Sequence, residues 1–155
     1  MRLVVQRVKR AALKADGVER AVIGKGFFIL AGACETDAPE DVVYLAGKIA
    51  KLRILEDDAG KMNLDVRETG GEVLIASQFT LYANTRKGNR PSFDEAARPE
   101  IAEPLILLLA DELRTQGVNV RTGVFGAYME IDMLCDGPVT IVIDSDERRI
   151  PRRQA

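Results

Sequence analysis

The stretch MEIDMLCDGPVTIVI, residues 129–143, decides the fold because it sets a Gly-Pro pair between two runs with strand character. The first run alternates apolar and acidic residues, and the second is rich in the β-branched residues that favour strands. Proline has no amide N–H for a β-ladder and a fixed φ, so Gly137-Pro138 marks an edge strand, a bulge or a special turn. Glycine beside it allows unusual backbone angles, so the pair could bring bare backbone close to a ligand.

Strand and helix patterns on either side of this stretch predict an α+β fold. Amphipathic helices are expected at residues 39–53 and 99–116, where apolar residues recur at helical spacing. Strands are expected at residues 3–15, 19–23, 27–33, 72–79, 118–122, 128–134 and 139–144. With only two long helices between hairpin-length connections, we predict one domain with an antiparallel or mixed sheet or a barrel-like core. The domain takes residues 1–145, and residues 146–155 form a charged tail that we expect to be frayed.

The composition is that of a soluble globular protein, with 46% hydrophobic and 30% charged residues among 155. There is no apolar stretch of membrane-spanning length and no signal-peptide pattern at the start, so we expect a cytoplasmic protein. Cys34 and Cys135 could form one disulfide, but in the cytoplasm we expect both thiols to be reduced. Two thiols without histidine do not make a zinc site.

The absence of histidine restricts the chemistry most. A chain with 0 His contains no Ser-His-Asp or Cys-His machinery and no His-ligated metal. Acid–base work then falls to other side chains, backbone groups, water or the substrate. Asp57, Asp58 and Asp65 lack the spacing of a calcium loop, and we expect no metal and no cofactor. A net charge of −2 means that a nucleic acid would have to be attracted by local basic patches.

Polar side chains gather where one predicted strand ends, in the sequence SQFTLY of residues 77–82. Strand ends that lead into loops often carry function. One interpretation is purely structural, a strand that finishes in a turn with Phe79 and Leu81 in the core. The other makes the segment a reaction centre, although a Ser77 or Thr80 nucleophile has no histidine to activate it.

The next segment, residues 84–92, is polar, basic and rich in turn formers, which predicts a loop. Its basic residues are Arg86, Lys87 and Arg90. The loop is either a solvated surface or a grip for phosphate, since arginine and lysine beside glycine offer charge and backbone donors together. The arginines of the tail are a weaker candidate for the same task.

Several short motifs follow one another in a characteristic order: residues 1–8, 52–54, 60–64, 77–82, 87–93, 122–129 and 136–140. Together they resemble the D-aminoacyl-tRNA deacylase family over nearly the whole chain. The resemblance implies a cytoplasmic homodimer that hydrolyses the ester between a D-amino acid, or glycine, and the terminal adenosine of tRNA. It thus implies an enzyme of translation proofreading that binds tRNA and recycles it after mischarging.

The resemblance also assigns roles to residues. It implies that the Gly137-Pro138 bond is cis and reaches into the active site of the other subunit, where backbone carbonyls exclude an L-side chain. Arg7 would hold this motif in orientation, and Met129 would belong to the substrate-binding residues. The catalytic segment would be Ser77, Gln78, Phe79 and Thr80, and the tRNA would contact Arg86, Lys87 and Arg90.

Catalysis without histidine is possible if the substrate assists. Aminoacyl esters are activated, and the neighbouring ribose hydroxyl can help to move a proton. The protein then has to orient the ester and stabilise the oxyanion, for example through backbone N–H groups near Phe79 and Thr80. On this view Thr80 positions the substrate and is not the nucleophile. Two residues depart from the family pattern: Cys135 stands where asparagine is usual, and Ile106 where tyrosine is common.

Two other functions remain open from the sequence. The first is a hydrolase of a different small ester or amide, with Thr80 or Cys135 as a true nucleophile. The second is a non-catalytic dimeric module that binds tRNA or protein. Substitution of each nucleophile candidate by alanine separates the first from the deacylase, and RNA binding without ester loss would indicate the second.

Overall fold

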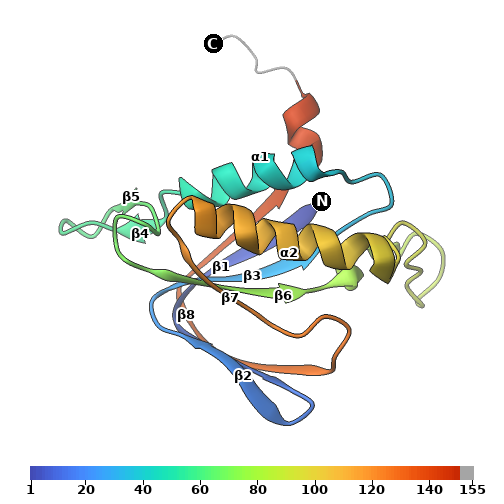
Figure 1. The fold of residues 1–155 in the computed structure, drawn as a ribbon, viewed down its shortest axis with the longest axis horizontal. Helices are drawn as coiled ribbons and strands as arrows, with labels where there is room; N and C mark the ends of the chain where they lie inside the picture. The colour runs from blue at the N-terminus through green and yellow to red at the C-terminus, as the bar shows by residue number, and fades with distance from the viewer. Residues whose placement is uncertain (151–155) are drawn as a thin grey trace.

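A mixed β-sheet carries two helices on one of its faces (Figure 1). The computed structural model of the protein describes residues 1–150. The strands are β1 (Arg2–Ala15), β2 (Val18–Ile23), β3 (Gly26–Gly32), β4 (Leu55–Glu56), β5 (Met62–Leu64), β6 (Glu72–Ser77), β7 (Asn119–Thr122) and β8 (Met129–Asp144). The helices are α1 (Pro39–Ala50) and α2 (Pro99–Thr115), with 3₁₀ turns η1 (Phe79–Tyr82) and η2 (Ser145–Arg149).

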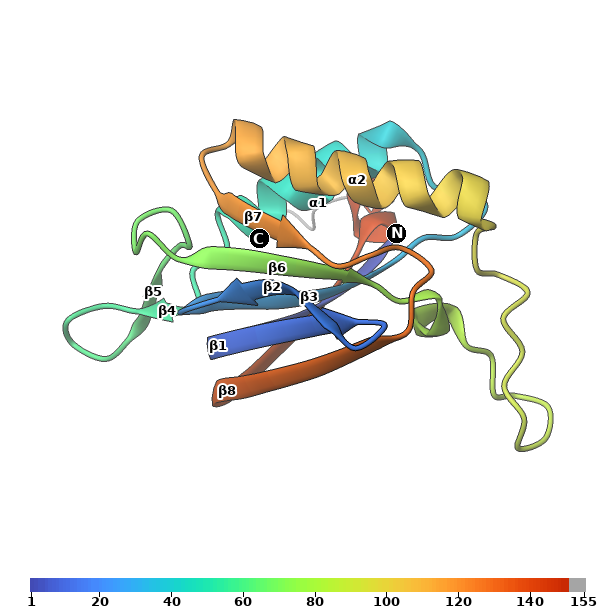
Figure 2. The same ribbon diagram turned by 60° about the horizontal axis from the view of Figure 1, so that its bottom comes forward.

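The main sheet has the order β2-β1-β3-β6-β7, and β8 pairs with the free edge of β1. β1 is antiparallel to β2, β3 and β8, whereas β6 is parallel to both β3 and β7. In Figure 2 both helices lie on the same side of this sheet, and β1 and β8 are the strands drawn farthest from them. The prediction of a single α+β domain with a mixed sheet and two long helices is confirmed, and the sheet is nearly closed.

The long strand β1 contributes to two hydrophobic cores because a bulge at Lys9 shifts its register. Val8 pairs with Cys135 and Arg10 with Leu134, so Lys9 has no partner on β8. One extra residue turns all later side chains to the opposite face of a sheet. Accordingly Leu3 and Val5, which precede the bulge, pack under the helices, while Ala11, Leu13 and Ala15, which follow it, lie in the second core. Val8 also lies in the second core, because side chains alternate between the two faces along a strand.

The strand β3 packs against both cores, as its uninterrupted apolar sequence predicted. Phe27 and Ile29 lie in the core beneath α1 and α2, whereas Phe28 lies in the second core together with Leu74 and Ala76 of β6. The Asp16-Gly17 turn predicted between β1 and β2 is also present, with positive φ values of 51° and 78°. Such angles match a tight hairpin between twisted strands.

The Gly-Pro pair lies in a backbone arch within β8. Thr140 pairs with Gln6 and Cys135 with Val8, so the four residues 136–139 stand opposite Arg7 alone. Such a surplus forces the chain out of the ladder. The two runs that the sequence separates are therefore one strand with an internal arch, and the Gly137-Pro138 bond is cis as the resemblance implied.

Two elements end earlier than their sequence patterns predicted. β6 ends at Ser77, because its neighbour β3 ends at Gly32 and the last rung joins the Gln78 amide to the Ala31 carbonyl at 2.8 Å. Residues 79–82 then form η1 and do not continue the strand. α1 ends at Ala50, where the Leu52 amide turns back to the Ile49 carbonyl at 3.2 Å. Such a bond closes the last turn tightly.

The expectation of a frayed tail is wrong for its first residues. Residues 145–149 form η2, and Arg148 donates a hydrogen bond of 3.0 Å to Asp41 on α1. Asp41 is buried and also accepts from the Ala38 amide at the start of α1. A buried carboxylate needs such partners, so the helix start and η2 stabilise each other. Two of the tail arginines that were candidates for binding phosphate, Arg152 and Arg153, lie outside the described residues.

Candidate active site

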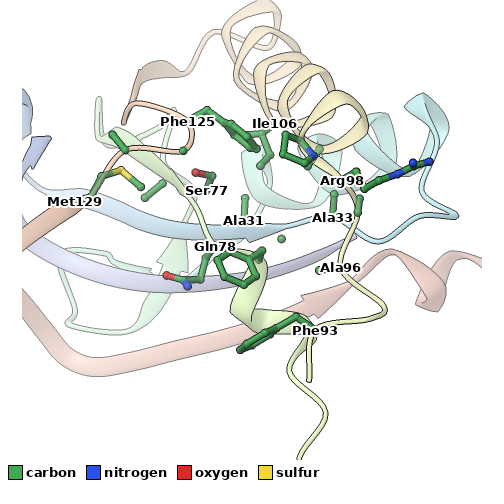
Figure 3. A pocket seen from close by; sticks show the side chains of 18 of the residues that line it. Ala31, Ala33, Ser77, Gln78, Phe93, Ala96, Arg98, Ile106, Phe125 and Met129 are labelled. Atoms are coloured by element: carbon green, nitrogen blue, oxygen red, sulfur yellow. The ribbon is translucent and has the colours of Figure 1, made fainter. Parts of the chain in front are cut away.

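A cavity of about 730 Å³ opens at the end of the sheet where β3 and β6 finish (Figure 3). The beginning of α2 covers one side, and the connection between β7 and β8 covers another. Its walls are mainly apolar, with Ala31, Ile106 and Phe125 among them. A volume of this size is typical of sites for small molecules or for the end of a larger ligand.

The predicted catalytic segment contributes polar groups to the cavity. Ser77 ends β6 and Gln78 directly precedes η1, and both line the cavity together with Phe79. The side-chain amide of Gln78 donates a hydrogen bond to the hydroxyl of Thr80, which is exposed beside the cavity. The first amides of a 3₁₀ turn have no acceptor inside the turn, so the backbone of Phe79 and Thr80 can donate to a ligand.

The strand does finish in a turn, as the structural interpretation of this segment expected, but Phe79 is 57% exposed, so its expected place in the core is wrong. Its ring meets that of Phe93 edge to face, with 5.0 Å between the ring centroids. Pairs of this geometry are favourable beyond their buried area. Leu81 is half-buried, and Tyr82 is the one residue of η1 that is buried. The turn thus presents an aromatic ring at the rim of the cavity.

Tyr82 is a phenol close to the site that stays neutral. Burial is the main cause that raises the pKa of Tyr82 far above its ordinary value, and the nearby carboxylate of Asp37 raises it further. A phenol with a raised pKa cannot accept a proton as a phenolate near neutral pH. The phenol of Tyr82 therefore does not serve as the general base of this site.

The predicted basic loop follows η1 and is closed by a bridge between Asn84 and Ser92. Arg86, Lys87 and Arg90 are exposed on it. The Asn84 side chain accepts a hydrogen bond of 3.0 Å from the Arg86 amide, which fixes the start of the loop. Phe93 directly follows the loop and contacts Phe79 at the rim of the cavity. The loop that carries the three basic residues is therefore anchored beside the cavity.

Arg7 lies under the backbone arch of β8. It is 4% exposed, and its Nε donates to the carbonyl oxygen of Asp136 at 2.9 Å. Gly137 has a φ of +130°, and a Cβ added there would lie 2.9 Å from the Val139 nitrogen and 3.4 Å from an Arg7 nitrogen. Glycine is therefore required by both the backbone angle and the close approach.

The structure brings together some predicted site residues but not all. Met129 lines the cavity with Ser77, Gln78 and Phe79, as Figure 3 shows for three of them. Arg7 and the Gly137-Pro138 pair are not among the residues that line it. They form a second group around the arch of β8. The candidate residues thus form two separate groups within the chain.

Several residues of the cavity were missed by the site prediction. Phe93, Arg98, Ile106 and Phe125 line it, and they come from a loop, the start of α2 and the β7–β8 connection. The backbone amide of Arg98 bonds to Glu35 at 3.0 Å, which fixes the entrance of the helix. The sequence marked one of them, because Ile106 stands at one of the two departures from the family pattern.

The remaining candidate residues for metal binding or thiol chemistry form no further reactive site among residues 1–150. Asp57 accepts hydrogen bonds from the Ala59 and Lys61 amides and caps the β4–β5 turn, and the bond from Lys61 lowers the pKa of this carboxyl. Cys34 and Cys135 are free thiols, as expected. Among residues 1–150, no three potential metal-ligating side chains gather at one point. No helix in that part of the chain is long and apolar enough to cross a membrane.

Comparison with known proteins gives one consistent family. The model of the D-Tyr-tRNA(Tyr) deacylase family matches residues 4–144. A D-aminoacyl-tRNA deacylase of Chloroflexus aurantiacus is 56% identical over 99% of this chain and 96% of its own length. One of Opitutus terrae is 52% identical over 96% and 99%.

Two solved structures have the same fold as this chain. A c-Myc DNA unwinding element binding protein is 36% identical, with a TM-score of 0.86 over 93% of this chain and 98% of its own. A probable eukaryotic D-amino acid tRNA deacylase is 16% identical, with a TM-score of 0.80 over 92% and 97%, and shares the fold. The chain belongs to the D-Tyr-tRNA(Tyr) deacylase family, and it is accordingly a hydrolase.

Proposed function

We propose that the protein hydrolyses the ester bond of D-aminoacyl-tRNA and glycyl-tRNA in the cytoplasm and rejects L-aminoacyl-tRNA, so that mischarged tRNA is proofread and recycled. The observation that carries this proposal is the cavity whose polar end consists of Ser77, Gln78 and the start of η1. Its apolar walls suit an amino-acid side chain and a nucleobase. Its polar end offers backbone donors for an ester carbonyl.

In this mechanism the protein supplies geometry, and the substrate supplies much of the reactivity. The ester carbonyl lies against the amides at the start of η1, which stabilise the negative charge of the tetrahedral intermediate. Gln78 and Thr80 are hydrogen-bonded to each other and orient the ester. Water attacks the carbonyl carbon, and the ribose hydroxyl of the terminal adenosine helps to transfer the proton. The ester C–O bond then breaks and releases the amino acid and the tRNA.

The chiral filter requires a second copy of the chain. The arch at residues 136–139 does not line the cavity of its own subunit, so it reaches a substrate only in a partner. β8 is an edge strand with exposed apolar residues, and Leu134 and Val142 are 49% and 58% exposed. An unprotected edge with apolar side chains is typical of an association surface. In a homodimer, the carbonyls of the arch would occupy the space of an L-side chain.

The proposal is tested with matched D- and L-tyrosyl-tRNA and with glycyl-tRNA. The purified protein should release amino acid from the D- and glycyl esters and leave the L-ester close to its spontaneous rate. Equal rates on the two enantiomers, or no reaction with the D-ester, would contradict the proposed function. Binding of tRNA without ester loss would identify the protein as a binding module instead.

Dimerisation gives a prediction for Leu134→Asp. A carboxylate on the apolar edge of β8 should prevent association, because burying an unpaired charge is costly. Sedimentation velocity should give a dimer for the unmodified chain and a monomer for the variant, and D-tyrosyl-tRNA hydrolysis should fall with it. Asp132→Asn, which changes a charge on the same strand without adding one, is the control. A monomeric unmodified chain with full enantiomer discrimination would exclude a filter built from two subunits.

Thr80 separates positioning from nucleophilic catalysis. For Thr80→Ala we expect kcat on D-tyrosyl-tRNA to fall about 10- to 100-fold, whereas loss of a true nucleophile costs on the order of a millionfold. Cys135→Ala should leave kcat nearly unchanged, because Cys135 does not line the cavity and its thiol faces Gln6 at 3.6 Å. Single-turnover hydrolysis measures both effects. Complete loss of turnover in either variant would assign that residue as the nucleophile.

The basic loop gives a prediction about tRNA affinity. Replacing Arg86, Lys87 and Arg90 with alanine should raise KM for D-tyrosyl-tRNA about tenfold and reduce the slope of log KM against log salt by about 2. kcat should change little, since the loop lies outside the reaction centre. The matched control replaces three exposed basic residues elsewhere: Arg20, Lys25 and Lys51. An equal effect of both triple variants would mean that the loop has no special contact with tRNA.

A further inference from the structure

Arg7 has acceptors on two separate parts of the fold. On one side its Nε donates to the Asp136 carbonyl at 2.9 Å and lies 3.4 Å from the Asp136 carboxylate. On the other side its Nη1 donates to the Ile54 carbonyl at 2.8 Å, and its Nη2 donates to the Glu56 carboxylate at 3.2 Å. The planar guanidinium is therefore clamped between the arch of β8 and the segment 54–56.

The segment 54–56 does not belong to the main sheet. It contains β4, which pairs with β5 in a small two-stranded sheet at one side of the molecule (Figure 1). Leu55 is buried and Ile54 nearly so, which anchors this segment to the core below the helices. The segment is thus a fixed support on the far side of Arg7 from the arch.

Glu56 determines how the guanidinium can rotate. The fork of an arginine fits a carboxylate with two parallel hydrogen bonds, so Arg7 has a competing geometry in which it binds the Asp136 carboxylate instead of the Asp136 carbonyl. The bond from Nη2 to Glu56 opposes that rotation, because it holds the opposite end of the fork. Rotation would also alter the contact with Gly137, where a Cβ would lie only 3.4 Å from Nη2.

We propose that Glu56 is a positioning residue for enantiomer selection: its carboxylate fixes the Arg7 guanidinium, which in turn holds the Asp136 carbonyl and the arch at residues 136–139. The β4–β5 segment thereby sets the orientation of the arch, although the two are far apart in the sequence. This inference rests on the proposed function, since the arch selects substrates only if it is the filter.

The test compares Glu56→Ala and Glu56→Gln with the unmodified chain as dimers, using kcat/KM for D- and L-tyrosyl-tRNA. Glu56 is half-exposed, so its charge-assisted bond is worth less than a buried one, and the D/L ratio should fall about fivefold in Glu56→Ala. Glu56→Gln keeps an acceptor oxygen, so the D/L ratio should fall by less in this variant. The melting temperatures of all three proteins should agree within a few degrees.

The control is Asp58→Asn, which removes a carboxylate from the turn of the same β4–β5 hairpin and should leave the D/L ratio unchanged. If the unmodified chain discriminates between the enantiomers and Glu56→Ala has the same D/L ratio, the inference is overturned and the proposed function stays intact. A ratio that falls equally in the control would also overturn it, because the effect would then be general to the hairpin. An unmodified chain that hydrolyses both esters equally would overturn the proposed function and this inference together.

Discussion

Gly137→Ala should lower the D/L ratio of hydrolysis at least tenfold, which corresponds to a change of about 1.4 kcal/mol between the two barriers. The φ of +130° at this position is rare for a residue with a side chain, and the new Cβ would meet Val139 Cγ2 at 2.8 Å and its nitrogen at 2.9 Å. The Val139 nitrogen is backbone and cannot rotate away, so the arch has to change shape. The ratio of kcat/KM values for D- and L-tyrosyl-tRNA measures this change.

Gly117→Ala is the matched control for this substitution. Gly117 also has a positive φ, +83°, but a Cβ there would have nothing within 4 Å. Both variants should lose about 1–3 kcal/mol of folding stability from backbone strain. Only Gly137→Ala should lose selectivity, since Gly117 follows the end of α2. A selective Gly137→Ala enzyme would show that the shape of the arch does not select the enantiomer.

Arg7→Ala should lower the free energy of unfolding by about 3 kcal/mol, the lower end of the range for breaking a buried ion pair. The side chain is 4% exposed, and its removal leaves the carbonyls of Ile54 and Asp136 without their donor. The partially exposed Glu56 can be solvated, which keeps the loss from being larger. Urea unfolding measures the stability, and the D/L ratio should fall together with it.

Arg10→Ala on the same two strands is the control for Arg7→Ala. Arg10 pairs with Asp132 across β1 and β8 at 3.3 Å, but both side chains are mostly exposed. Exposed pairs of this kind contribute about 0–1 kcal/mol, so the variant should unfold nearly like the unmodified chain. If both variants lost the same stability, the burial of Arg7 could not be the reason for its effect.

The local patterns of the sequence predicted most elements correctly, and the errors arose where distant strands decide. The Asp16-Gly17 hairpin and the two helices depend on neighbouring residues, which periodicity and turn chemistry describe. The end of β6 at Ser77 depends on where β3 stops pairing, which no local signal contains. Local signals also do not predict that η2 forms, because its Arg148 binds Asp41 on the distant helix α1.

The residues of the candidate site also divide into those that the sequence could identify and those that only the fold brings together. Ser77, Gln78 and Thr80 are adjacent in sequence, so a motif could identify them. Phe93 and Phe125 approach them only through the topology of the sheet and α2, and their aromatic character alone is equally consistent with a core position. The contact between Arg7 and Glu56 joins two elements through one charge pair, and neither residue shows in the sequence that it has this partner.

The bulge at Lys9 gives β1 a place in both hydrophobic cores of the protein, and this has a consequence for how the protein unfolds. The first half of the strand closes the core under the helices, and the second half closes the core on the opposite face. Neither core can lose β1 without opening the other to water, so the two behave as one cooperative unit and not as separate subdomains. The end of β3 at the cavity and the strand β8 that carries the arch both pair with β1, so the cavity and the arch are lost or kept together.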